Sequence, residues 1–468
     1  EIAFMPLHLQ LALIRNKKMT CTELLDIYME RIQTVNDKQK LNCFIHKNYE
    51  SAKSQATELD ALAKHNSWRG PLHGAILTVK DDLDVKNFTT TCGSKSLENW
   101  QPSTDAICIA KLKQAGAVIL AKTNLDEFSF GALGYNEYFG QVKNPHNLNY
   151  SPGGSSSGSA AATASGICSA SIASDASGAI RVPASACGIY GFKSTIGAIN
   201  QTGLSSFVPT KDAIGCMARS PQDLRLLFNT MSSTKKEMQF QIKPIHSNSI
   251  KIGYISDILN AINENNKNTF LNSIEKLQQL DFKVKPLLLG DLKLLHETGR
   301  IINFTEQSAW IEILTSERLN LQNTKKSFQN HIIKRLEFAE KISAPRYYKA
   351  KAIQKELFLK KILSVFEQVD FIALPTTGER PPLINSIKDR ILSLDREIEN
   401  FKFPCEVAGL LGLPAITIPQ GTDELSLPHG LQIIGKPNTD NDLIDLCIFL
   451  QTKFDGYQKP KFLNNSQS

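Results

Sequence analysis

The N-terminal part of the chain carries apolar side chains at helical spacing. Residues 6–35 repeat them every three or four positions, which predicts two helices, with Ile32 on the apolar face of the second. A threonine just before that face, Thr20 or Thr22, is expected to be the N-cap of the second helix.

Continuous apolar runs of strand length follow, and they alternate with helical segments. AILTVK at 75–80 and VILAKT at 118–123 predict buried strands. Helical patterns over 50–65 and 105–117 precede them. This alternation predicts a three-layer α/β domain.

The size and pattern of the side chains change twice further along the chain. Residues 151–200 contain almost no large side chains, so this stretch either packs backbone against backbone or brings N–H groups up to a ligand. FIALPTT (371–377), LPAITIPQG (413–421) and HGLQIIG (429–435) return to a buried-strand pattern. We therefore expect one domain over residues 1–468, whose core is built from both ends of the chain.

Four segments make up this expected domain. A helical N-terminal segment, a core segment, a Lys- and Leu-rich helical excursion and a C-terminal return to the core span about 1–65, 66–220, 221–368 and 369–455. The tail after 455 is expected to fray.

Composition narrows the class of protein. The chain has 468 residues, of which 41% are hydrophobic and 21% charged, so it can bury a core and is not a disordered chain. The net charge of +7 (53 basic minus 46 acidic) permits an anionic partner without requiring one.

The cysteines and the hydropathy of the chain argue against three kinds of feature: a zinc site, a disulfide framework and a membrane span. The nine cysteines are scattered and never form C-x-x-C, so neither a zinc site nor a disulfide framework is expected, and a reducing compartment is favoured. No run approaches the roughly 18 apolar residues of a membrane span. The expected location is the cytoplasm. Because the chain begins with Glu1 and not Met, an organellar matrix is the alternative if a leader has been removed.

Three places combine turn-prone backbone with reactive side chains. Lys80 ends a predicted buried strand, where it either reaches solvent or, removed from water, acts as a base. The run Gly153–Gly158 (GGSSSG) suits a turn into a helix N-terminus. The run Asp175–Pro183 (DASGAIRVP) is small enough for its N–H groups to converge as an oxyanion hole, although a generic turn has the same composition.

The sequence does not support other hydrolase motifs or nucleotide-binding motifs. GSSSG at 154–158 fits G-x-S-x-G, but NPHNLNYSP before it is loop, and that motif requires a strand. The nearest histidine is His146, which makes a Ser-His-Asp triad hard to assemble. H-E-x-x-H, Walker A and G-x-G-x-x-G are all missing from the sequence.

The three places, in this order, resemble the amidase signature family. GPLHGAILTVKDDLDV (70–85), AGAVILAKTNLDEFSFG (115–131), NPHNLNYSPGGSSSGSAA (144–161) and LPHGLQIIG (427–435) carry the resemblance, which covers roughly two-thirds of the chain. It implies a single α/β/α sandwich around a large mixed sheet, and an amidase that uses no cofactor and no metal.

The resemblance also implies a mechanism. In the family, a Ser–cis-Ser–Lys unit works without histidine: a neutral lysine takes a proton from a bridging serine, which activates the nucleophilic serine. That serine attacks the amide carbonyl, the amine leaves, and water cleaves the acyl-enzyme.

Carried over residue by residue, the lysine is Lys80 and the bridging serine is Ser155. The nucleophile belongs 24 positions later, at 155 + 24 = 179, where this chain has Ala179. The chain as written is therefore expected not to form an acyl-enzyme. Ser177 is not expected to replace the nucleophile, because even about 1 Å of displacement is costly for catalysis.

Two explanations of the alanine stay open. Ala179 is either native to a pseudo-amidase kept for binding or assembly, or an engineered Ser→Ala change. Intact Lys80, Ser155 and Arg181 favour the second explanation, because drift would erode them, whereas Ser177 in place of a smaller residue favours natural divergence.

Other residues receive supporting roles from the resemblance. The oxyanion hole is expected from backbone N–H groups within Ala176, Ser177, Gly178 and Ala179, with Asp175 and Arg181 bracing the loop. Ser156, Ser157 and Ser159 are expected to serve as turn and helix-cap hydroxyls.

The substrate is less defined than the chemistry. TNLDEFSFG resembles the glutamyl-tRNA amidotransferase A subunit, whereas FVPTKDAIG (207–215) resembles free-standing indoleacetamide- and mandelamide-type amidases. The lining candidates are Phe128, Phe130 and Tyr135, with Arg335 or Arg346 for a carboxylate; core aromatics and surface arginines are the alternatives.

Three functions therefore stand: an amidase for a small or aryl amide, an amidotransferase component that releases ammonia from glutamine and docks a tRNA-binding partner, or a non-catalytic scaffold. The expected partner is a small-molecule amide. The assemblies left open are a homodimer and a complex with the tRNA-binding partner.

Overall fold

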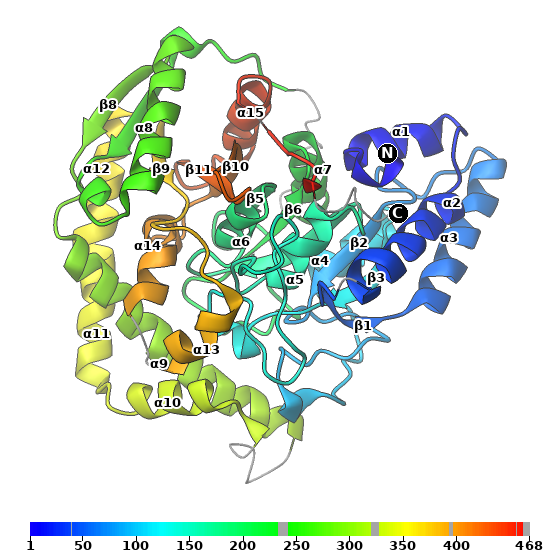
Figure 1. Cartoon of the computed structure of the whole chain (residues 1–468), viewed down its shortest axis with the longest axis horizontal. Coiled ribbons are helices and arrows are strands. Elements are labelled where there is room, and N and C mark those ends of the chain that lie inside the picture. Colours follow the sequence, from blue (N-terminus) through cyan, green and yellow to red (C-terminus); the bar gives the residue numbers. More distant parts are fainter. Residues whose placement is uncertain (39, 233–241, 320–326, 393–395, 455, 462–468) are drawn as a thin grey trace.

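A computed structural model describes residues 1–38, 40–232, 242–319, 327–392, 396–454 and 456–461. Its centre is an 11-stranded sheet of order β1-β3-β2-β4-β6-β5-β10-β11-β9-β7-β8 (Figure 1). The strands are β1 (Phe44–Lys47), β2 (Ile76–Lys80), β3 (Val118–Thr123), β4 (Ala170–Asp175), β5 (Tyr190–Lys193), β6 (Ala213–Ala218), β7 (Lys251–Ile255), β8 (Lys283–Leu287), β9 (Phe371–Pro375), β10 (Ala415–Thr422) and β11 (Pro428–Ile434).

The sheet is mixed. Strand β2 pairs in parallel with β3 and β4, and β7 pairs in parallel with β8 and β9. The strands between β4 and β9 pair antiparallel. The fold class expected from the resemblance, an α/β domain around a large mixed sheet, is confirmed.

Helices cover both faces of this sheet. They are α1 (Leu7–Arg15), α2 (Cys21–Arg31), α3 (Tyr49–Lys64), α4 (Ile107–Gln114), α5 (Ser157–Ala164), α6 (Arg181–Ala186), α7 (Pro221–Met231), α8 (Glu264–Gln279), α9 (Leu292–Leu319), α10 (Asn330–Ala339), α11 (Ala344–Ala352), α12 (Lys360–Gln368), α13 (Ile384–Leu392), α14 (Arg396–Leu410) and α15 (Asp440–Gln451).

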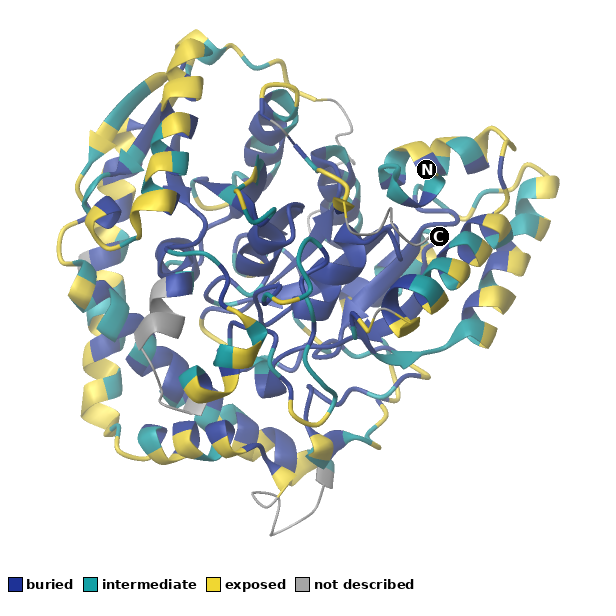
Figure 2. Cartoon of the chain, in the orientation of Figure 1, coloured by how far each residue is buried: buried dark blue, intermediate teal, exposed yellow. Residues whose placement is uncertain are grey.

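Side-chain alternation along the central strands separates the layers. In β4, Ile172 joins the main hydrophobic cluster with α4, α7 and α15, while Ala173 joins a second cluster with α5 and α6. Cys216 and Met217 in β6 divide in the same way. Since neighbouring residues of a strand point to opposite faces, these helices form the two outer layers. Figure 2 shows the buried interior between them.

Most predicted elements are present, with two differences. The predicted helical pair is confirmed, and Thr20 makes a capping box with Glu23. However, 221–368 is not wholly helical, because KIGYI and KVKPL form β7 and β8 at one edge of the sheet. Likewise FIHK within the N-terminal helical segment forms β1. Such short runs lie within longer helical patterns and are easily missed.

Three further observations concern the cysteines, membrane-spanning helices and the C-terminal tail. All nine cysteines are buried and free. No helix among the described residues is long and apolar enough to cross a membrane. The predicted fraying of the tail concerns residues that lie largely outside those described, since 455 and 462–468 are not among them.

Candidate active site

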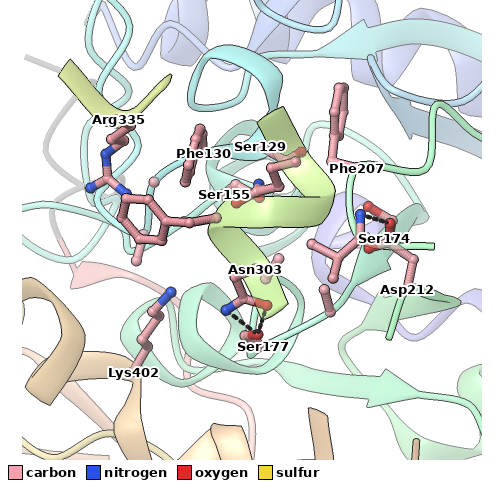
Figure 3. Close-up of a pocket in the computed structure, with 18 of the residues that line it drawn as sticks. Ser129, Phe130, Ser155, Ser174, Ser177, Phe207, Asp212, Asn303, Arg335 and Lys402 are labelled. Carbon is pink, nitrogen blue, oxygen red and sulfur yellow. Dashed lines mark hydrogen bonds between the residues drawn. The ribbon is translucent and has the colours of Figure 1, made fainter. Parts of the chain in front are cut away.

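The predicted reactive residues meet at one cavity. It encloses about 620 Å³ of space, part of it open to solvent, and lies between the loop after β4, the turn before α5 and helix α9 (Figure 3). Lys80, Ser155 and Ala179 all line it, although the first and the last are 99 positions apart in the sequence (179 − 80).

Lys80 is the last residue of β2 and is fully buried. Its Nζ donates hydrogen bonds to Ser155 Oγ at 3.0 Å and to Ser174 Oγ at 3.2 Å. The same Nζ lies 3.1 Å from Asp82 Oδ2. A strand-end lysine reaching solvent, the alternative weighed from the sequence, is therefore wrong.

Asp82 and Ser174 are residues that the sequence reasoning missed. Ser174 Oγ donates to Asp82 Oδ2 at 2.6 Å, so the hydroxyl and the carboxylate fix each other beside Lys80. A signal was present, because Asp82 stands two positions after Lys80 and a strand period of two returns a side chain to the same face. Asp81 points the other way and forms a 2.7 Å ion pair with Lys122.

Ser155 stands in the turn before α5. The peptide bond between Gly154 and Ser155 is cis. A Cβ on Gly154 would come within 2.3 Å of Asp126 Oδ2 and 2.8 Å of Gly134 N, so the turn has room for glycine alone. Burial raises the pKa of Asp126 to about 6, although its carboxylate accepts backbone hydrogen bonds from this wall.

The neighbouring serines do not act as the expected helix caps. Ser156 stands at the N-cap of α5 but makes no side-chain cap bond, and its Oγ donates to Ser174 O at 3.4 Å instead. Ser157 Oγ reaches Asn124 O at 3.4 Å, and Ser159 Oγ lies 2.6 Å from Thr123 Oγ1. All three are buried, so their hydroxyls satisfy packing contacts to neighbouring strands and loops.

Asp175 organises the loop after β4. Its carboxylate accepts from the N–H groups of Gly178 at 2.7 Å and Ile180 at 3.1 Å, and from two Arg181 nitrogens, each at 2.9 Å. Burial by itself would raise the pKa of Asp175, but the Arg181 guanidinium outweighs this and holds it below its usual range. Arg181 also donates to Cys405 O and Gln432 Oε1, so it ties the loop to the C-terminal segment.

Three of the four residues expected to form the oxyanion hole line the cavity, and Gly178 does not. Ala176, Ser177 and Ala179 line the cavity. The Gly178 N–H is already taken by Asp175. Ala179 places a methyl group where the resemblance expects a hydroxyl, so the loop itself holds Ser177 as its one hydroxyl on the cavity wall.

A second lysine, Lys211, stands behind this loop and was not singled out from the sequence. Its buried Nζ donates to Ser177 Oγ at 2.8 Å and to Asn303 Oδ1 at 2.9 Å, and it forms an ion pair with Glu406. Figure 3 shows Asn303 of α9 and Ser177 turned toward each other. The cluster joins the loop to α9 and α14.

Two of the remaining candidates for cavity-lining residues lie on the outer wall of the cavity. Phe130 and Arg335 line the cavity, with the guanidinium 4.9 Å from the ring centre. The other three candidates do not line the cavity. Phe128 is buried in the same hydrophobic cluster as Phe130, Tyr135 packs beside Ala132 and Leu133, and Arg346 pairs with Glu297 at the surface. These are the core-aromatic and surface-arginine alternatives.

The described residues contain no cluster of possible metal ligands. Among the residues that the structure describes, no three His, Cys, Asp or Glu side chains come together as a metal site requires. Asp212 lines the cavity, and burial raises the pKa of its carboxyl to about 6.

Several known proteins are similar to this chain over nearly its full length. A family model described as Amidase matches residues 23–444. The A subunit of glutamyl-tRNA(Gln) amidotransferase from Saccharolobus solfataricus is 29% identical, covering 94% of each chain. Its counterpart from Halalkalibacterium halodurans is 32% identical, covering 90% of this chain and 92% of that one.

A solved structure described as an amidase gives the same result at the level of the fold. It superposes with a TM-score of 0.85 and 26% identity, covering 96% of this chain and 100% of its own. The likeness therefore extends over the sheet, the helices and the segments that carry the cavity.

Proposed function

Because the chain belongs to the amidase signature family, we propose that its cavity is built for covalent hydrolysis of a carboxylic amide, and that Ala179 leaves it able to bind the amide without forming an acyl-enzyme. The observation that carries this proposal is the 3.0 Å contact between Lys80 Nζ and Ser155 Oγ on a cavity that Ala179 also lines.

With a serine at position 179, the proton path has a defined order. Lys80, in its neutral form, takes the Ser155 hydroxyl proton while Ser155 takes the proton of the attacking serine. The serine oxygen bonds to the amide carbon, and the N–H groups of Ser177 and of position 179 stabilise the negative oxygen. The proton then goes to the leaving amine, and water releases the carboxylic acid by the reverse path.

Asp82 and Ser174 hold Lys80 in place for this path. Both are buried, and both contact its Nζ. A fixed amine keeps the transfer distance to Ser155 short, which is what general base catalysis requires. In the chain as it stands, the path ends at Ser155 because the Ala179 methyl group has no proton to give.

Charge on the cavity wall supports an anionic amide as the substrate class. Apart from Lys80, which acts in its neutral form, the lining includes the basic side chains of Arg300, Arg335 and Lys402, whereas Asp212 is the single acidic one among the described lining residues. A carboxylate on the acyl part of the amide complements this wall.

A second function is favoured by a separate observation. Proteins named as the A subunit of glutamyl-tRNA(Gln) amidotransferase match more than nine-tenths of this chain. Under this alternative the amide is glutamine, and the chain works with a tRNA-binding partner. A chain that stays monomeric and does not respond to tRNA or to a candidate partner protein in size-exclusion chromatography would count against it.

The test restores the missing hydroxyl. Ala179→Ser is expected to release ammonia from at least one member of a panel of amides that includes glutamine, while Ala179→Gly and Ala179→Ser with Lys80→Met release none. A folded Ala179→Ser protein that is inactive on every amide and ester would favour the third function, a non-catalytic scaffold. A serine codon at 179 in the genomic coding sequence would identify the alanine as engineered.

A further inference from the structure

Two sides of the cavity carry charges of opposite sign. Figure 3 shows Arg335 and Lys402 on one side and Asp212 with Ser174 on the other. Ser174 contacts Lys80 Nζ at 3.2 Å, so the acidic side is the side of the reactive residues. The basic side therefore lies away from the place where an amide bond would be cleaved.

Three helices bring positive side chains to the basic side. Arg300 stands on α9, Arg335 on α10 and Lys402 on α14, and all three line the cavity. Arg300 and Arg335 both lie against the Phe304 ring, 5.5 and 5.7 Å from its centre. An aromatic face attracts a guanidinium and limits its movement. The ring thus keeps two positive groups at the cavity although they repel each other.

Asp212 is a poor partner for a positive group of a ligand. Its Oδ2 accepts from Ser206 Oγ and from Val208 N, each at 2.8 Å, so the carboxylate holds its own loop. Burial raises the pKa of this carboxyl to about 6, so its neutral form is more favoured than that of an ordinary aspartate. Among the described lining residues, an amine at the basic side would have no acidic side chain beside it.

We propose that the cavity selects an amide that carries a carboxylate but no amine, with Lys402 as a specificity-determining residue that excludes the amine. The inference rests on the proposed function, which places the amide at Lys80 and Ser155, so the far end of the ligand meets the basic side. Because charge acts over distance, a ligand group near Arg335 meets the charge of Lys402 without touching it. A carboxylate is attracted there, whereas an ammonium is repelled.

This inference separates the two functions considered above. Glutamine has its carboxylate and its ammonium on the same carbon, so the ammonium would accompany the carboxylate to the basic side. Glutaramate, the monoamide of glutaric acid, has the same chain and the same amide without the amine. The charge arrangement therefore favours monoamides of simple dicarboxylic acids and disfavours glutamine.

The test measures the binding of three amides with equal chain length to the full protein by isothermal titration calorimetry. They are glutaramate, glutamine and pentanamide, which lacks the carboxylate. Ala179 helps this measurement, because the amides are expected to bind without being cleaved. We expect glutaramate to bind at least about 10-fold more tightly than either of the other two.

Substitutions at Lys402 test its role. Lys402→Met should lower the ratio of glutaramate to glutamine affinity about 10-fold, whereas Lys402→Arg, which keeps the charge, should preserve it. Lys402 is half-buried, so both variants are expected to fold, and circular dichroism checks this. Lys388→Met is the matched control. It removes an exposed lysine of α13 that pairs with Glu137 outside the cavity lining, and it should leave the ratio unchanged.

Three results would each overturn the inference: equal affinity for glutamine and glutaramate, no binding of glutaramate at millimolar concentration, or an unchanged ratio in Lys402→Met. If the proposed function alone fails, Ala179→Ser releases no ammonia from any amide, yet the unaltered chain still binds glutaramate in preference to glutamine. If this inference alone fails, Ala179→Ser releases ammonia from glutamine at least as fast as from glutaramate.

Discussion

Asp175 and Arg181 form the buried ion pair on which the cavity loop depends. Both side chains are fully buried, and the carboxylate also holds the N–H groups of Gly178 and Ile180. Breaking a buried pair by removing one charge is costly because the other charge stays buried without compensation. The loop's shape is therefore tied to a single carboxylate.

Asp175→Asn tests this dependence. We expect it to lower the free energy of unfolding by about 3–5 kcal/mol, since it leaves the Arg181 guanidinium unpaired. Asp105→Asn, which breaks a partly exposed pair with Lys113, should cost below about 1 kcal/mol. Denaturant unfolding followed by circular dichroism measures both, and similar losses in the two variants would contradict the argument.

At this scale the sequence predicted the motif residues better than their neighbours. The resemblance placed Lys80, Ser155 and Ala179 together, and the structure has all three on one cavity, while their catalytic roles stay a prediction. Lys211 and Glu406 were not found, because they are 195 residues apart and no local pattern links them. Contacts between distant segments leave no periodic signal in a single sequence.

Helix α5 packs its first turn against backbone. A Cβ on Gly158 would come within 2.3 Å of Cys43 O and 2.6 Å of Asn124 N. Because backbone atoms cannot rotate away as a flexible side chain can, the helix would have to move, and Ser155 stands just before it. The glycine thus sets how closely the turn approaches the neighbouring loops.

Gly158→Ala is expected to lower the free energy of unfolding by about 1–3 kcal/mol or more through overpacking. Gly197→Ala is the matched control: nothing lies within 4 Å of its Cβ, but its φ of +80° costs about 1 kcal/mol of backbone strain. Thermal unfolding compares the two. In the Ala179→Ser background, Gly158→Ala should also lower amide hydrolysis, and unchanged activity and stability would refute the packing argument.

Glu127 links the turn that precedes Phe130 to the start of α10. Its carboxylate accepts from Ser94 Oγ at 2.6 Å and from Gln329 N at 2.9 Å. Burial raises the pKa of Glu127 from 4.5 to about 7. Its neutral form is therefore favoured in the folded protein, and the stability that it contributes is present below pH 4.5 and lost as the pH rises through about 7.

Glu127→Gln should remove this pH dependence. An amide can accept from Gln329 N and donate to Ser94, so the contacts survive without the buried charge. We expect the variant to gain about 1–3 kcal/mol over the unaltered chain between pH 5 and pH 8. Glu137→Gln, at an exposed pair with Lys388, should show no such gain. Unfolding midpoints at the two pH values measure the difference, and parallel curves would contradict it.

At the scale of elements, continuous apolar runs predicted several strands, but the strands within helical patterns and the central strands made of small residues were missed. VILAKT and FIALP were predicted and form β3 and β9. ASIASD and AIGCMA form β4 and β6, the centre of the sheet, although their side chains are mostly small. Small residues let α5 and α6 approach these strands closely, and that closeness is visible only in the folded protein.

At the scale of the whole molecule, strand pairing between distant parts of the chain joins the two halves of the sheet. Strand β10 pairs antiparallel with β5, and β11 joins β10 to β9. Figure 1 shows the C-terminal strands lying beside the middle of the sheet. Arg181 adds a side-chain link across the same junction through Cys405 O and Gln432. The segment 369–455, proposed from the sequence as a return to the core, thus completes the sheet on which the cavity stands.

A cut at this junction tests whether the chain folds as one unit. A fragment of residues 1–368 would lose β9, β10, β11 and α15, leaving β5 as an unpaired edge and Arg181 without two of its acceptors. Exposed strand edges and buried groups without partners favour aggregation over folding. We therefore expect the fragment alone to lack a cooperative thermal transition and to be degraded rapidly by protease. Co-expression with residues 369–468 should restore a soluble complex, because the strand pairings supply the association energy. A fragment that unfolds cooperatively alone would mean that the N-terminal and middle segments form an independent domain, and that the return strands are an addition to it.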